Sequence, residues 1–73
     1  MTTPPPAHHL SRRQLLVLHR LAQGHTKAEV GGMLHISRHT VDFHTRNILT
    51  RLQAKNVVAA VYRASLMGLL PRE

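Results

Sequence analysis

The sequence has no cysteine and no tryptophan, and its 73 residues include one phenylalanine, Phe43, and one tyrosine, Tyr62. Without cysteine, disulfide bonds and thiolate metal sites are excluded. Two such rings are too few for a platform on which successive bases stack, which argues against single-stranded nucleic acid as the ligand. No apolar run approaches the roughly eighteen residues of a membrane span, and no apolar secretion signal follows the start. We therefore expect a soluble cytoplasmic protein with no membrane partner.

Acidic residues are also scarce: three stand against ten lysines and arginines, which gives a net charge of +7 with histidine neutral. Nine of the ten basic residues lie between Arg12 and Arg63. A small basic domain is attracted to polyanions through counterion release. A solvated cationic surface is the plainer interpretation. Binding to a membrane surface is disfavoured because no helix pairs a broad apolar face with a lysine-rich one.

The organisation of the chain follows from its first residues. Three consecutive prolines stand at 4–6, and no large apolar residue follows them until Leu10. Such a stretch favours polyproline II and cannot add to a core. We expect a disordered tail at 1–9, one small domain at 10–70 and a C-terminal tail at 71–73.

Two capping boxes predict the first two helices. Ser11 is followed three residues later by Gln14, and Thr26 is followed by Glu29. In this pattern each side chain bonds the other residue's backbone N–H at a helix start. Gly24 is placed to end the first helix.

Two further helices follow the turn at 35–37, in which Ile36 is expected to plug the core. Ser37 is the predicted cap of a third helix over 38–52, and Asn56 of a fourth that ends before Gly68. No strand pattern competes, so the predicted fold is all-α with four helices.

Gly31 and Gly32 lie within the second predicted helix, where each costs about 1 kcal/mol relative to alanine. One interpretation is a close backbone approach to a neighbour at this point, and the other is a weak helix that frays; the two are compatible.

Residues 26–52 have the layout of a helix-turn-helix, in which the second helix enters the DNA major groove. At 100° per residue, one side of the helix over 38–52 gathers the predicted core residues Val41, Thr45, Ile48 and Leu52. The opposite side gathers His39, Phe43, Arg46 and Thr50.

Four residues of this helix are candidate base contacts. Arg46 can fork onto guanine O6 and N7, and Phe43 can contact a thymine methyl group. Their alternatives are a phosphate contact or solvated charge for Arg46, and packing against a partner for Phe43. His39 is placed to approach a base or a phosphate. Asp42 either accepts a hydrogen bond from a cytosine N4 amino group or pairs along the helix with Arg38 and Arg46.

A larger set offers hydroxyls, cations and helix N-termini, the usual ligands of phosphate. For Thr26 and Ser37 helix capping is an equal alternative, and the two roles can coexist. The candidate DNA backbone contacts are Thr26, Lys27, Ser37, Arg38, Thr40, Asn47 and Thr50.

Metal binding and catalysis find little support. Seven histidines are present, but His35 and His39 flank a helix cap, and His39 and His44 point to different sides of one helix. The three carboxylates cannot be placed as an acid–base pair, and no serine has an evident His–carboxylate partner. We expect no cofactor, no metal and no enzymatic activity.

The fourth helix carries two apolar sides, and one helix in so small a domain cannot bury both. We expect Val58, Leu66 and Leu69 to face the core and the other side to form a symmetric dimer. The predicted dimer residues are Val57, Ala60, Val61, Ala64 and Met67. Burial of both sides in the core is the alternative.

These residues resemble the LuxR-type (GerE-type) four-helix DNA-binding domain. The match runs from Leu10 to Leu70 and includes L-S-R-R at 10–13, L-A-Q-G at 21–24, L-H-I-S at 34–37, T-V-x-x-H at 40–44 and the closing G-L-L. The resemblance implies a third helix that reads the major groove and a fourth that commonly forms the dimer contact. RNA polymerase is a further expected partner. Most members carry a sensory domain as well, so this chain resembles the small stand-alone ones. Asp42 and Gln53 depart from the pattern, which favours lysine or arginine and glycine there.

The resulting prediction is a transcriptional regulator of the bacterial cytoplasm, associated with the nucleoid. It binds double-stranded DNA sequence-specifically through the helix over 38–52, as a homodimer on an inverted repeat. The alternative is a protein-interaction adaptor built on the same fold, with weak or no specific DNA binding. Asp42 and Phe43 are the evidence for the adaptor.

Overall fold

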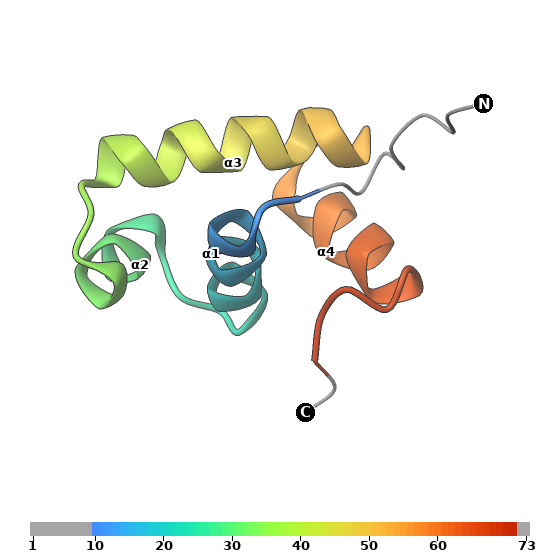
Figure 1. Cartoon of the computed structure of the whole chain (residues 1–73), viewed down its shortest axis with the longest axis horizontal. Helices are drawn as coiled ribbons and strands as arrows, with labels where there is room; N and C mark the ends of the chain where they lie inside the picture. The colour runs from blue at the N-terminus through green and yellow to red at the C-terminus, as the bar shows by residue number, and fades with distance from the viewer. Residues whose placement is uncertain (1–9, 72–73) are drawn as a thin grey trace.

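One long helix runs along one side of the molecule, and the shorter helices lie in a row beneath it (Figure 1). The computed structural model describes residues 10–71. The predicted tail at 1–9 and residues 72–73 lie outside this range. The four helices are α1 (Arg12–Ala22), α2 (Lys27–Leu34), α3 (Arg38–Leu52) and α4 (Val57–Leu66). The all-α prediction with four helices is confirmed.

Every helix begins at its predicted cap. Ser11 with Gln14 and Thr26 with Glu29 both form complete capping boxes, with side-chain bonds in both directions. The Ser37 hydroxyl accepts a hydrogen bond from the backbone N–H of Thr40 at 3.0 Å. The Asn56 side chain accepts one from the backbone N–H of Ala59 at 2.8 Å. These bonds satisfy backbone donors that have no partner within the helix.

Two of the helices end on a residue other than glycine in the left-handed conformation. His35 follows α2 with φ 59°, and Gln53 follows α3 with φ 54°. A side chain is disfavoured there because its Cβ crowds the backbone. The position of Gln53, which favours glycine in the resembled domain, is therefore a left-handed helix end.

The core lies where α1, α2 and α4 pack against α3. The face of α3 predicted to be buried is buried: Val41, Ile48 and Leu52 are at most 2% exposed, and Thr45 is 4% exposed. The Thr45 hydroxyl donates to the Val41 carbonyl at 2.8 Å, which satisfies a buried polar group. Ile36 packs against this core from the turn, as expected.

Gly31 and Gly32 differ in their surroundings. A Cβ added to Gly31 would lie 2.8 Å from the carbonyl oxygen of Ile36, closer than real Cβ atoms come to such a neighbour. A Cβ added to Gly32 would meet nothing within 4 Å. The interpretation as a close backbone approach is therefore confirmed for Gly31 alone.

The predicted dimer face of α4 is corrected by the packing. Ala60 and Ala64 are fully buried in the core, so they cannot contact a second protomer. The core takes the side with these small residues because α4 packs on α1 and α3 there. Val58 and Leu66, on the other side, were expected to face the core. Val58 is 78% exposed and Leu66 is 70% exposed, so that expectation is wrong for both.

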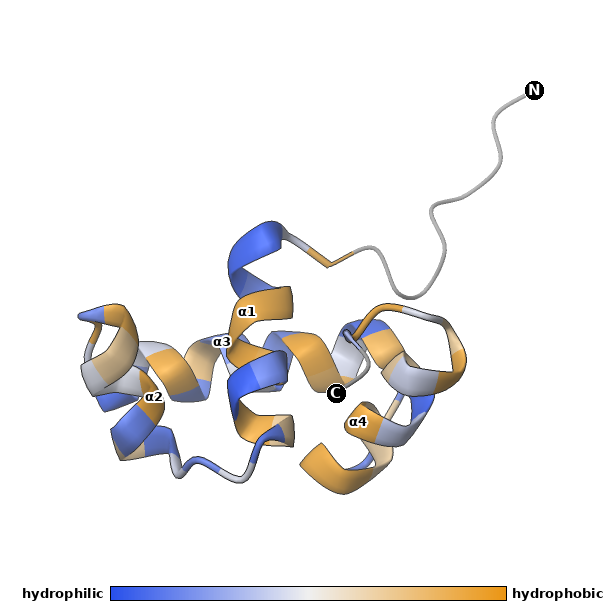
Figure 2. Ribbon diagram, turned by 90° about the horizontal axis from the view of Figure 1, so that it is seen from below, coloured by the Kyte–Doolittle hydropathy of each residue, from blue (hydrophilic) through white to orange (hydrophobic). Residues whose placement is uncertain are grey.

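The remaining predicted dimer residues are Val57 and Val61, both half-buried, and Met67, which is exposed. Val61 packs against the core. Seen from the side away from α3, much of α4 is hydrophobic (Figure 2). Its outward apolar side chains are those of Val58, Tyr62 and Leu66.

Candidate nucleic-acid interface

The solvent-facing side of α3 is the strongest candidate for a binding surface. His39, Phe43, Arg46 and Thr50 are all exposed, and they lie opposite the buried side of the helix. The other three helices lie on one side of α3, so this face is open along the length of the helix (Figure 1). A rod of this kind has the dimensions that the major groove admits.

Phe43 is the apolar residue of this face. Its side chain is 54% exposed, although a phenylalanine stabilises a fold most when its ring is buried in the core. The centroid of its ring lies 6.0 Å from the ring centroid of the neighbouring His44, and the two ring planes make an angle of 60°. The ring therefore stays outside the core and gives the exposed face an apolar contact point.

The hydroxyl groups predicted to contact the DNA backbone have local partners. Besides its capping bond, the Ser37 hydroxyl lies 3.0 Å from the Thr40 hydroxyl. The Thr50 hydroxyl donates to the Arg46 carbonyl at 3.1 Å. The Thr26 hydroxyl accepts from the Glu29 N–H at 3.1 Å. A hydroxyl has one donor and two acceptor sites, so each of these groups keeps capacity for a further bond.

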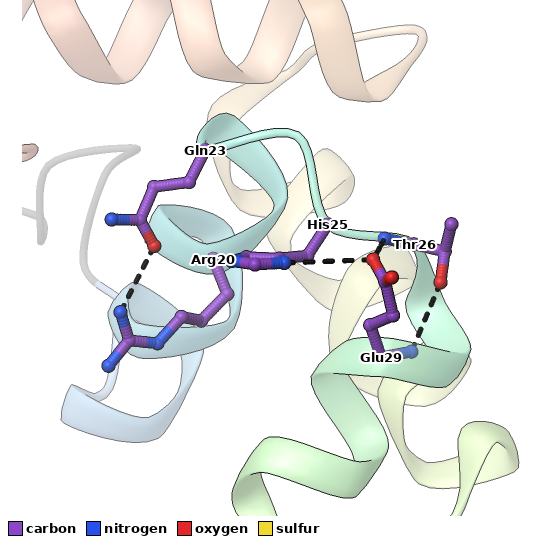
Figure 3. Close-up of polar contacts among 5 residues, drawn as sticks. All are labelled: Arg20, Gln23, His25, Thr26 and Glu29. Carbon is purple, nitrogen blue, oxygen red and sulfur yellow. Dashed lines mark hydrogen bonds and ion pairs between the residues drawn. The ribbon is translucent and has the colours of Figure 1, made fainter.

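The start of α2 is held by a set of polar contacts (Figure 3). The Thr26 N–H donates to the Glu29 carboxylate at 2.8 Å, and this bond is the main reason why the pKa of Glu29 lies below its ordinary value. His25 Nδ1 lies 3.6 Å from the same carboxylate. At the end of α1, Arg20 Nη1 donates to Gln23 Oε1 at 3.0 Å. These contacts order the connection that places the start of α2.

Asp42 pairs with a residue that the sequence pattern did not indicate. Lys27 Nζ, in the first turn of α2, lies 3.0 Å from Asp42 Oδ1 on α3. The hydrogen bond from Lys27 is the largest cause that lowers the pKa of Asp42, and the charges of Lys27, Arg38 and Arg46 lower it further. Pairing along α3 was one of the two alternatives for Asp42, and the ion pair that forms instead joins two helices. The sequence carries no signal for this ion pair, because Lys27 and Asp42 are brought together only by the way α2 crosses α3.

The other predicted backbone contacts lie around this helix pair. Arg38 is exposed at the start of α3, and Asn47 is half-buried on the flank of α3 away from Asp42. Lys27 and Asp42 each keep about a third of their side-chain surface exposed, 36% and 32%. The predicted base contacts therefore lie on α3, and the predicted backbone contacts lie along α3 and at the start of α2. Their contact with DNA stays a prediction.

The site thus consists of a capped α2, a short turn with a left-handed residue and an exposed α3. The sequence that forms it matches a known family. The profile of the family described as "Bacterial regulatory proteins, luxR family" covers residues 8–64 of the chain. The chain belongs to the LuxR family. It corresponds to the helix-turn-helix DNA-binding domain of these regulators, which are not enzymes.

Individual LuxR-family proteins align over most of the chain. The transcriptional activator protein SolR of Ralstonia nicotianae is 43% identical over 61 residues, which is 84% of this chain and 26% of SolR. The nitrate/nitrite response regulator protein NarP of Escherichia coli is 45% identical over 51 residues, which is 70% of this chain and 24% of NarP. The crystal structure of Escherichia coli SdiA superposes with a TM-score of 0.83 at 31% identity, covering 96% of this chain and 29% of SdiA.

The chain spans about a quarter of the length of the curated LuxR-family relatives that it matches. Within residues 10–71 there is no group of three or more histidine and acidic side chains placed to hold a metal ion. None of the four described helices has the length and apolar character needed to cross a membrane.

Proposed function

We propose that this LuxR-family domain binds double-stranded DNA sequence-specifically, with α3 in the major groove, and regulates transcription in the bacterial cytoplasm. The observation that carries the proposal is the exposed side of α3, where His39, Phe43, Arg46 and Thr50 share one open face. The net charge of +7 supports attraction to phosphate.

Three residues of the open face suit particular contacts. Arg46 is the candidate for guanine, because its guanidinium matches the O6 and N7 acceptors of that base. Phe43 is the candidate for a thymine methyl group, since a 54% exposed ring has its apolar area outside the core. His39, in the first turn of α3, is placed to approach a base or a phosphate.

The phosphate contacts would fix the register of α3 in the groove. Thr26, Ser37 and Thr40 lie at the starts of α2 and α3, where backbone N–H groups and the helix dipole also favour an anion. Arg38, Asn47 and Thr50 lie along α3 itself.

A homodimer on an inverted repeat is the second part of the proposal. The outward stripe of Val58, Tyr62 and Leu66 follows the spacing i, i+4, i+8 on α4 and is 65–78% exposed. An exposed apolar stripe of this kind marks an interaction surface. Packed against its symmetry mate, it would place two copies of α3 in successive major grooves.

Selection of bound duplexes from a random pool, followed by a salt titration, tests the proposal. The selected duplex should bind much more tightly than random DNA, and log affinity should fall with log salt at a slope of about −0.9 per phosphate contacted. Arg46→Ala should relax the base preference at one position, by about 1–3 kcal/mol.

The opposite result is equally clear. If selected and random duplexes bind equally and feebly even at low salt, the proposal fails. The protein-interaction adaptor is then the better description of the fold.

A further inference from the structure

Asp42 is the one acidic residue of α3, the helix proposed to face DNA. Asp42 directly precedes the exposed Phe43, and its side chain is 32% exposed. A carboxylate near the phosphates of DNA is repelled by them. A side chain that only filled space there would not need to be charged.

Lys27 removes most of this disadvantage. Its ammonium group lies 3.0 Å from Asp42 Oδ1, so the pair carries no net charge. Lys27 belongs to the first turn of α2, whose position is set by the Thr26–Glu29 capping box. The lysine therefore holds the aspartate from a different helix and restricts its orientation.

The chemistry of the held carboxylate selects one base. An ionised carboxylate only accepts hydrogen bonds, and it has two oxygen atoms with which to do so. In the major groove guanine presents two acceptors, thymine presents an acceptor and a methyl group, and adenine presents an acceptor beside its amino group. Cytosine presents its N4 amino donor, so it is the base that an acceptor-only group matches best.

We propose that Lys27 and Asp42 form a specificity element in which Lys27 positions the Asp42 carboxylate to accept a hydrogen bond from the N4 amino group of a cytosine. Asp42 is the specificity-determining residue, and Lys27 acts through it rather than on a phosphate. The inference rests on the proposed function, since it requires α3 to lie in the major groove.

The experiment measures the affinity of the full chain for the selected duplex with each of the four bases at every position in turn. For the wild-type protein, one position should prefer cytosine by about tenfold. Asp42→Asn should move the preference at that position to adenine, because an amide matches both the amino group and N7 of adenine.

Lys27→Met tests the positioning role, and Lys55→Met is its control. Both variants lose one positive charge from an exposed or half-buried lysine. Lys27→Met should reduce the cytosine preference by about threefold or more and leave the position read by Arg46 unchanged. Lys55→Met should weaken all four duplexes equally. Circular dichroism should show that every variant remains helical.

Three results would overturn the inference. The first is a selected duplex that the wild-type protein binds specifically but with no position that prefers cytosine. This result would leave the proposed function standing. The second is an Asp42→Asn protein that still prefers cytosine. The third is a Lys27→Met protein that weakens all duplexes equally, as expected of a phosphate contact. If no selected duplex binds better than random DNA, the proposed function fails as well.

Discussion

The carbonyl oxygen of Gly31 accepts a hydrogen bond from the backbone N–H of Ile36 at 2.9 Å. The two residues also approach each other so closely that a Cβ on Gly31 would lie 2.8 Å from the Ile36 carbonyl oxygen. This approach turns the chain from α2 into α3. The geometry of the helix-turn-helix therefore depends on the missing side chain at one position.

Gly31→Ala should lower the free energy of unfolding, because the new methyl group meets backbone that cannot move without opening the turn. Overpacking of this kind costs about 1–3 kcal/mol. Gly32→Ala is the matched control, one residue away in the same helix with nothing within 4 Å of the added Cβ. It should raise the free energy of unfolding by up to about 1 kcal/mol. Urea denaturation measures both, and equal effects of the two substitutions would refute the close approach.

Gln53→Gly should stabilise the domain. Gln53 ends α3 with φ 54°, a conformation that disfavours a side chain and suits glycine, so relief of about 1 kcal/mol is expected. Gln23 ends α1 with φ −77°, where glycine offers no such relief. The melting temperature should therefore rise by several degrees for Gln53→Gly and not rise for Gln23→Gly. A rise in both variants would mean that the left-handed conformation is not the cause.

The ion pair between Lys27 and Asp42 predicts a definite pH response. The pKa of Asp42 is lowered, chiefly by the hydrogen bond from Lys27. A carboxyl group with a folded pKa below its unfolded value, about 3.9, contributes stability that is present above that value. The contribution is lost as the pH falls through the folded pKa. Asp42 should thus support the fold at neutral pH and cease to do so in acid.

Carboxyl chemical shifts followed through an acid titration by NMR measure this response. In the wild-type protein Asp42 should titrate below the ordinary aspartate range. Lys27→Met should raise the pKa of Asp42 toward that range and leave the pKa of Glu29 low, since the Thr26 N–H is the main cause there. An Asp42 pKa that does not respond to the substitution would show that Lys27 is not its partner in solution.

Much of the fold follows from local rules, and these rules could be applied to the sequence directly. A cap such as Ser37 acts on a backbone N–H three residues away, so its partner is known from spacing alone. The buried side of α3 follows from a helical period, which depends only on backbone geometry. The open face with Phe43 and Arg46 is the side of α3 opposite these buried residues, so the same period predicts it.

What could not be predicted depends on how helices cross. Lys27 and Asp42 are fifteen positions apart on different helices, and no local spacing relates them. On α4, the side with Ala60 and the side with Val58 both repeat apolar residues at helical spacing. Which side is buried was decided by the size of the side chains, since small ones allow α4 to approach its neighbours closely.

The outward face of α4 carries the exposed apolar residues Val58, Tyr62 and Leu66. Tyr62 lies in the middle of the outward stripe and is 65% exposed, so Tyr62→Glu should leave the protomer folded and place a charge in the proposed dimer contact. Arg63→Gln is the control, because it also lowers the net charge by one from an exposed position on the same helix.

If α4 forms the dimer, Tyr62→Glu should weaken binding to an inverted repeat by roughly 100-fold, since the second half-site no longer adds to the affinity. Binding to a single half-site should change little, and Arg63→Gln should keep the two-protomer complex. Ala60→Leu, by contrast, should destabilise the protomer itself by about 1–3 kcal/mol, because it overpacks a fully buried site.

Sedimentation of the protein with each duplex counts the protomers bound. A two-protomer complex that survives Tyr62→Glu would place the dimer contact elsewhere on the molecule.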